Sequence, residues 1–215
     1  RWDKMVLLYS EQGNNGKGTF CSMIRNVLGT KATASISLFQ FSKQFGLTSL
    51  IGINTVLTDE NPVGSFIGDT AALKSAVTGD SMMIDIKHKE PITYKFNGFI
   101  IQCVNELPKT QDRSDSFYRR QLFIPMTKLF TGRERKYIKE DYLKRQEVLE
   151  YILHRALHHQ ITELPVPQSS AKFLDEYKSY NDPIREFFYE VESDLKWDKV
   201  PFSFLYDLYK SWSHK

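Results

Sequence analysis

The sequence has few cysteines and no long apolar run, and each shortage narrows the class of protein. Among 215 residues there are only 2 cysteines, Cys21 and Cys103, each inside an apolar run. We therefore expect two buried thiols from a reducing compartment and no disulfide. No apolar run approaches the roughly 20 residues needed to span a bilayer, and we identify no signal peptide. We accordingly expect a cytoplasmic protein with no membrane partner.

The sequence also has little net charge. A net charge of +3 is too small to indicate nucleic-acid binding by itself, so any basic surface must be local. The hydrophobic fraction of 41% supports a substantial core, and 215 residues suffice for one large domain or for a domain with an appendage. The chain starts at Arg1 almost directly in a predicted strand, and we interpret it as a fragment of a longer protein.

The most informative stretch is a glycine-rich segment between an apolar run at residues 5–9 and an amphipathic run ending near Leu28. A strand, a glycine-rich turn with lysine and a helix form the phosphate-binding loop of nucleotide-binding proteins. Glycines let backbone N–H groups surround a phosphate, and the helix N-terminus points at the anion. We assign nucleotide binding to Gly13, Asn14, Asn15, Gly16, Lys17, Gly18 and Thr19.

Within this loop, Lys17 is predicted to bind the outer phosphates of a nucleotide, and Thr19 to place a hydroxyl near Mg²⁺. The match to the usual motif is imperfect. Glu11 stands where a glycine is usual, and Gly18 stands where a serine or threonine is usual. The alternative is an ordinary glycine-rich turn before a helix, but the flanking strand and helix favour the phosphate loop.

Two carboxylates follow a β-rich run at residues 50–58. We expect Asp59 to hold Mg²⁺, directly or through water, and Glu60 to polarise the attacking water. Taken alone, the pair is more typical of a solvated acidic turn. Downstream of a phosphate loop, the nucleotide site is the better interpretation.

The most continuous apolar run, residues 99–104, predicts a central strand buried on both faces. Asn105 follows it and could reach the γ-phosphate or the attacking water; alternatively it only starts the turn before Pro108. Arg119 and Arg120 precede another predicted strand, with an apolar part at residues 122–125.

Two β-prone runs, residues 82–86 and 92–96, predict a hairpin whose tip carries Lys87, His88 and Lys89. The basic side chains of this tip could bind the phosphate backbone of a nucleic acid. Without further context, an ordinary solvated turn is the more common explanation.

After residue 132 the pattern becomes helical. We predict a helix over residues 140–161, a linker over 164–170 and three further helices up to Trp212. His154 and His158 lie one turn apart, but no cysteine or acidic partner completes a metal site. We divide the chain into an ATPase core (1–127), a helical extension (128–165) and the helical start of another domain (166–215).

The order of these motifs resembles the superfamily 3 helicases, a branch of the AAA+ ATPases, and most of all the helicase part of phage and plasmid primase-helicases related to poxvirus-type proteins. The resemblance covers residues 5–126 well, and the last helices look like the start of a winged-helix-like domain. It is carried by residues 13–20, 58–60, Lys74 with 78–80, 105–108 and 117–120.

The resemblance implies an α/β fold, an AAA+ P-loop core with a central mostly parallel sheet, followed by helices. It implies that Asn105 senses the γ-phosphate and that Arg119 or Arg120, with a slight preference for Arg120, is an arginine finger acting on the neighbouring subunit. Lys87, His88 and Lys89 would line a channel for single-stranded DNA.

By the same resemblance, the full-length protein forms a homo-oligomeric, presumed hexameric, ring that hydrolyses ATP with Mg²⁺ and unwinds DNA during replication of a phage, plasmid or other mobile element in a bacterial host cell. A primase domain would precede Arg1.

Two other functions stay open at this point. A small-molecule kinase needs an arginine-rich lid soon after the phosphate helix, yet Arg25 stands alone until Arg113. A replication initiator or loader that uses ATP only to assemble on DNA, without unwinding it, is the main alternative. Glu60 beside Asp59 favours turnover over assembly alone.

Overall fold

The computed structural model describes residues 2–64 and 66–213, and its centre is a five-stranded sheet in the order β2-β3-β7-β1-β9. The predicted domain limits at residues 1 and 215 lie outside the described residues. All the strand pairings of this sheet are parallel. The expectation of an α/β fold with a central, mostly parallel sheet is therefore confirmed. The strands are β1 (Met5–Tyr9), β2 (Thr33–Ala34), β3 (Thr55–Thr58), β7 (Phe99–Val104) and β9 (Gln121–Pro125).

The middle strand of the sheet is β7, with β3 on one side and β1 on the other. Five of its six residues are buried, as the continuous apolar run predicts. Parallel strands place their carboxyl ends at one edge of a sheet, so the residues that follow β1, β3 and β7 all lie at the same edge.

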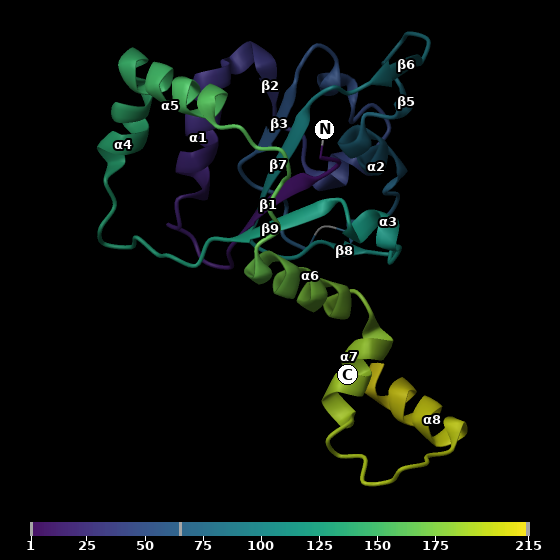
Figure 1. The fold of residues 1–215 in the computed structure, drawn as a ribbon. Helices are drawn as coiled ribbons and strands as arrows, with labels where there is room; N and C mark the ends of the chain where they lie inside the picture. The colour runs from purple at the N-terminus through teal and green to yellow at the C-terminus, as the bar shows by residue number, and fades with distance from the viewer. Residues whose placement is uncertain (1, 65, 214–215) are drawn as a thin grey trace.

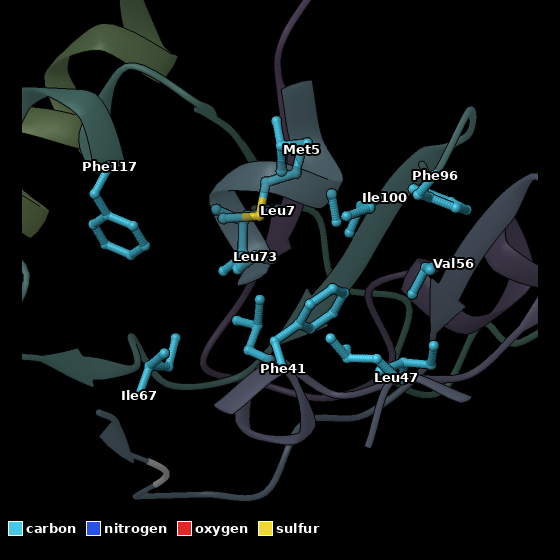
Figure 2. Packing of buried hydrophobic residues seen from close by; sticks show 14 of the residues in the cluster. Met5, Leu7, Phe41, Leu47, Val56, Ile67, Leu73, Phe96, Ile100 and Phe117 are labelled. Carbon is cyan, nitrogen blue, oxygen red and sulfur yellow. The ribbon is translucent and has the colours of Figure 1, made fainter. Parts of the chain in front are cut away.

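Alternate residues along the strands separate into two hydrophobic clusters, one on each face of the sheet. On one face, Leu7 and Ile100 pack with Leu73 of helix α2 (Ala71–Thr78). Figure 2 shows this larger cluster, with Phe117 and Phe96 towards its two ends and Phe41 between them.

The other face carries Leu8 and Cys103, which pack against Cys21 of helix α1 (Lys17–Leu28). Helices α4 (Lys136–Glu140) and α5 (Gln146–His158) lie beside α1, on the side of the sheet away from α2 (Figure 1). The result is a three-layered α/β/α arrangement with the glycine-rich loop where β1 leads into α1.

Two predicted elements differ from the structure. The β-rich run at 50–58 forms a strand only from Thr55, because residues 51–54 turn through Gly52, which has a φ of 82°. The predicted limits of the helix over residues 140–161 are wrong. A separate short helix α4 and a 3₁₀ turn (Tyr142–Lys144) precede α5, which ends at His158.

Three small elements were not expected from the sequence. Short strands β4 (Phe66–Ile67) and β8 (Lys109–Thr110) pair in parallel, and a four-residue helix α3 (Asp115–Tyr118) leads into β9. Ser114 caps α3 by accepting a hydrogen bond from the N–H of Phe117. The predicted hairpin is present: β5 (Ser81–Ile84) pairs antiparallel with β6 (Ile92–Lys95).

Three helices complete the chain: α6 (Gln168–Tyr180), α7 (Pro183–Val191) and α8 (Phe202–Ser213). Helix α6 packs on β9, where the fully buried Tyr177 donates a hydrogen bond of 2.7 Å to the carbonyl of Pro108. Helices α7 and α8 pack against each other and project away from the sheet (Figure 1). The domain boundary expected at residue 166 stays a prediction. Helix α6, which follows this boundary in the sequence, packs on β9 of the central sheet.

Candidate nucleotide-binding site

The loop between β1 and α1 has the backbone conformation that its glycines and asparagines allow. Gly16 is the N-cap of α1 and adopts a left-handed conformation with φ of 90°, while Asn14 has φ of 53°. A side chain with a Cβ would be strained at Gly16. Asn15 is buried: its Oδ1 accepts from the N–H of Lys17 at 3.1 Å, and its Nδ2 donates to the carbonyl of Gln12. The Asn15 side chain therefore links the backbone of Gln12 to that of Lys17 and stabilises the loop conformation.

The ammonium group of Lys17 lies between two neighbouring strands. It donates to the carbonyl of Ser10, after β1, at 2.9 Å and to Oδ1 of Asn105, after β7, at 2.7 Å. Lys17 is only 7% exposed, and this burial lowers the pKa of its ammonium below the ordinary value. An ammonium has three N–H donors, and Ser10 and Asn105 accept from two of them. Among the described residues there is no acceptor for the third, which stays available for a ligand.

The two acidic residues follow β3, the strand on the other side of β7. Both are exposed, and Asp59 forms an ion pair of 3.2 Å with Arg25 of α1. The next residue, Asn61, fixes this turn by donating to the carbonyl of Cys103 and to the side chain of Gln102, both at 2.9 Å. The predicted residues Lys17, Asn105 and Asp59 thus come from three adjacent positions along one sheet edge, and Lys17 and Asn105 are in direct contact.

The donor set of this edge fits a phosphate with a cation beside it. In the described residues, the N–H groups of Gly18 and Thr19 have no hydrogen-bond acceptor, as expected in the first turn of a helix. Nothing lies within 4 Å of a Cβ built at Gly13, so the mouth of the loop is open. Backbone donors with a lysine suit an anion, and the exposed carboxylate of Asp59 suits Mg²⁺.

The role expected of Thr19 fits this geometry less well. Successive residues of an α-helix are about 100° apart, so Thr19 lies about 200° around α1 from Lys17. Lys17 and Cys21, one turn apart, and Ile24, a further turn along, lie on the side of α1 that faces the sheet. The magnesium role of Thr19 stays a prediction that its position does not favour.

Glu11, the departure from the usual motif, also has a structural role. Its Oε1 accepts a hydrogen bond of 2.8 Å from the hydroxyl of Tyr9. Burial and this bond raise the pKa of Tyr9 to about 12, so Tyr9 stays a neutral donor. The contact anchors the first turn of the loop to the end of β1.

A segment that the sequence analysis did not connect with the loop packs directly against it. The N–H of Phe130 donates to the carbonyl of Asn14 at 2.8 Å, and Nδ2 of Asn14 donates to Glu134 at 3.1 Å. A Cβ at Gly18 would lie 3.6 Å from the ammonium of Lys139. The residues of each pair are more than a hundred positions apart in the sequence. The basic composition of residues 133–139 was the only sequence feature that could have indicated a role for this segment at the loop.

The two arginines lie at the opposite edge of the sheet. Residues 119 and 120 precede β9, whose first residue, Gln121, pairs with Met5 at the start of β1. Five residues of strand, roughly 16 Å at 3.3 Å each, separate that edge from the loop. Neither arginine can therefore act on a ligand at Lys17 of its own chain.

The arginines also differ in environment. Arg120 is half-buried and donates from Nη1 to the carbonyl of Ser116, inside its own chain. Arg119 is exposed, and its guanidinium has no hydrogen bond or ion pair with any residue that the structure describes. An exposed, unpaired guanidinium is available to another molecule, which favours Arg119 over the Arg120 preferred from sequence.

The hairpin tip is exposed, with Lys87, His88 and Lys89 at its turn and a left-handed φ of 61° at His88. An open groove of about 730 Å³ lies beside it. Phe45, 45% exposed, lines this groove together with His88 and Lys89.

The two thiols are buried, and their sulfur atoms lie 3.4 Å apart between α1 and β7. Both cysteines are free, as expected. The hydrogen bond between the two thiols raises the pKa of Cys21 and lowers that of Cys103. On α5, the rings of His154 and His158 stack at 4.0 Å, and the described residues hold no cluster of three or more His, Cys, Asp or Glu suited to a metal.

Comparison with known proteins gives the family. Residues 8–120 match the model of a family of unknown function, DUF5906. Because this match covers more than half of the chain, the chain belongs to that family. Residues 179–215 match a second model, described as poxvirus D5 protein-like. No curated protein matches the chain.

Among solved structures, the chain is similar to the C-terminal region of NrS-1. The apo structure of its residues 305–718 has 14% identity and a TM-score of 0.59, and an A-form apo structure has 15% identity and a TM-score of 0.55. In both cases the similarity covers 97% of this chain and 53% of the other, so the chain spans about half the length of these relatives. At this identity the similarity shows a shared fold.

None of the described helices is long and apolar enough to cross a membrane.

Proposed function

We propose that the chain is the ATP-hydrolysing part of a replicative DNA helicase of the superfamily 3 type. The observation that carries the proposal is the contact between Lys17 and Asn105, with Asp59 on the next strand along the same edge. Lysine on a helix N-terminus, amide and carboxylate are the groups that P-loop ATPases use. The match of residues 179–215 to the poxvirus D5-like model supports a relationship to that helicase type.

In this proposal, the backbone of residues 13–19 and the ammonium of Lys17 bind the phosphates of ATP. Asp59 would hold Mg²⁺, which would supply positive charge beside the transferred phosphoryl group. Glu60, exposed beside Asp59, orients the attacking water. Asn105 holds Lys17 in place before ATP binds and contacts the γ-phosphate or the water afterwards.

A second copy of the chain completes the site. Because Arg119 lies across the sheet from Lys17, it can reach a nucleotide only in a neighbouring subunit. An arginine in that position stabilises negative charge that develops in the transition state. A ring of subunits, hexameric in this proposal, places each Arg119 at the site of the next copy.

Single-stranded DNA is the polymer that we propose the hairpin tip binds. Lys87, His88 and Lys89 contact its phosphates, and the exposed ring of Phe45 in the adjoining groove offers a surface for base stacking. Contacts of both kinds are independent of base sequence, and the phosphate contacts depend on salt.

The test is ATP hydrolysis by the full-length protein with and without single-stranded DNA, followed by a strand-separation assay. We expect DNA-stimulated hydrolysis that Lys17→Ala abolishes, whereas Lys31→Ala, on the exposed turn after α1, leaves it unchanged. Near-normal hydrolysis in Lys17→Ala would contradict the assigned site. Hydrolysis without strand separation would instead support the alternative, an initiator or loader that assembles on DNA.

A further inference from the structure

The residue that follows Lys17 is unusual for a phosphate loop. Gly18 occupies the position where the usual motif has a serine or threonine whose hydroxyl binds Mg²⁺. Thr19, the next hydroxyl along the chain, lies on the far side of α1 from Lys17. The first turn of the helix therefore lacks a hydroxyl on the side that faces the ligand.

The space beside Gly18 is approached by a cation from another element. A Cβ at Gly18 would lie 3.6 Å from the ammonium of Lys139, which belongs to α4. Lys139 is exposed and forms no ion pair or hydrogen bond with the residues at 2–64 and 66–213. Its ammonium therefore lies beside Gly18, in the first turn of α1, where the N–H groups of Gly18 and Thr19 have no acceptor among the described residues.

The position of α4 is fixed by packing on the loop itself. The backbone bond from Phe130 to Asn14 and the side-chain bond from Asn14 to Glu134 attach the preceding segment to the loop. The Phe130 ring lies 3.8 Å from where a Cβ of Gly16 would be. Three contacts along the preceding segment thus hold the start of α4 beside the loop, so the backbone of Lys139 lies near Gly18.

We infer that Lys139 is a second phosphate-binding cation of the nucleotide site and compensates for the hydroxyl that Gly18 lacks. This inference rests on the proposed function. A lysine binds phosphate oxygens directly, whereas a hydroxyl acts on them through Mg²⁺. Nucleotide binding by this chain is therefore less dependent on Mg²⁺ than it would be with a hydroxyl alone.

The test measures the Kd of ATP by calorimetry on the full-length protein, once with Mg²⁺ and once with EDTA. We expect Lys139→Ala to weaken binding in EDTA by about tenfold or more, the loss of one charge-assisted contact. Lys139→Arg should stay within about threefold of the wild type, since the charge is kept. Lys136→Ala, on the same helix, is the matched control and should not change either Kd.

A second variant separates charge from packing. In Lys139→Ala, the additional change Gly18→Ser should recover affinity with Mg²⁺ but not in EDTA, because a hydroxyl is a ligand for the metal. Equal recovery in both conditions would mean that the two positions act through packing and would overturn the inference. Wild-type affinity of Lys139→Ala in EDTA would also overturn it and leave the proposed function intact. Absence of ATP binding by the wild type would instead refute the proposed function.

Discussion

The ammonium of Lys17 and the amide oxygen of Asn105 form a hydrogen bond of 2.7 Å that joins helix α1 to strand β7. One helical turn further, Cys21 meets Cys103, two residues earlier in the strand, at 3.4 Å. Four helical residues rise about 6 Å. Two strand residues rise about 6.6 Å. The two contacts are therefore in register, and the packing of the thiols sets the spacing of the polar pair.

Replacing Asn105 by alanine should uncouple binding from hydrolysis. The variant removes a partner of Lys17 but leaves the loop and its backbone donors, so we expect ATP affinity within about threefold and hydrolysis reduced by about 10²-fold. Asn97→Ala, an exposed amide before β7, is the control and should behave as wild type. Parallel losses of binding and hydrolysis would mean that Asn105 only positions Lys17.

Arg119 and Arg120 should give different results when each is replaced by alanine. Arg120 is half-buried and bonded to Ser116, so its loss should lower the free energy of unfolding by about 1–2 kcal/mol. Arg119→Ala should leave stability unchanged and remove hydrolysis while ATP still binds. Mixing Arg119→Ala with Lys17→Ala subunits should restore some activity, because each supplies what the other lacks. No recovery in the mixture would contradict a site shared between subunits.

The hairpin variant Lys87→Ala with Lys89→Ala should weaken binding of single-stranded DNA and reduce its dependence on salt by about two counterions. Phe45→Ala should weaken binding equally at low and high salt, because stacking is not electrostatic. Lys95→Ala, at the far end of β6, is the control. Fluorescence anisotropy at several salt concentrations measures all of them, and unchanged affinity in the hairpin variant would exclude the tip from the DNA site.

Asp112 should contribute stability that depends on pH. Burial alone would raise its pKa, but bonds from Lys74, Ser114 and Thr70 outweigh burial and hold the pKa well below the ordinary value. A depressed folded-state pKa means that the contribution is complete above the unfolded pKa of about 3.9 and is lost as pH falls below it.

We therefore expect Asp112→Asn to cost about 1–3 kcal/mol at pH 7 in urea unfolding and progressively less below about pH 4. Asp198→Asn, in an exposed loop, should cost little at any pH. A cost for Asp112→Asn that stays constant down to pH 3 would contradict the assigned network.

Tyr177 should be essential for attaching α6 to the sheet. Tyr177→Phe loses one buried hydrogen bond to Pro108 and should cost about 1 kcal/mol, whereas Tyr177→Ala also leaves a cavity and should cost about 3–5 kcal/mol. Tyr189→Phe, 66% exposed, is the control for thermal unfolding. A mild effect of Tyr177→Ala would mean that α6 is dispensable for the core.

Most strands were predictable because their signal is local. The runs at β1 and β7 are continuous and apolar, and the polar residues that end them follow directly. The loop at 13–16, the hairpin and the helix α1 also carry their own turn and capping residues. Residues 50–54 misled the prediction because β-prone side chains there occupy a turn that Gly52 and the buried Leu50 determine together.

The sequence by itself determined the order of the polar groups along the chain, because each follows a strand or precedes a helix that its neighbours specify. Only the tertiary structure decided which of them meet. Strand order brings Asn105 to Lys17 and sends Arg119 to the opposite edge, and packing of the segment at 130–139 brings Lys139 to Gly18. Such contacts arise from burial shared among distant segments, and no local pattern encodes them.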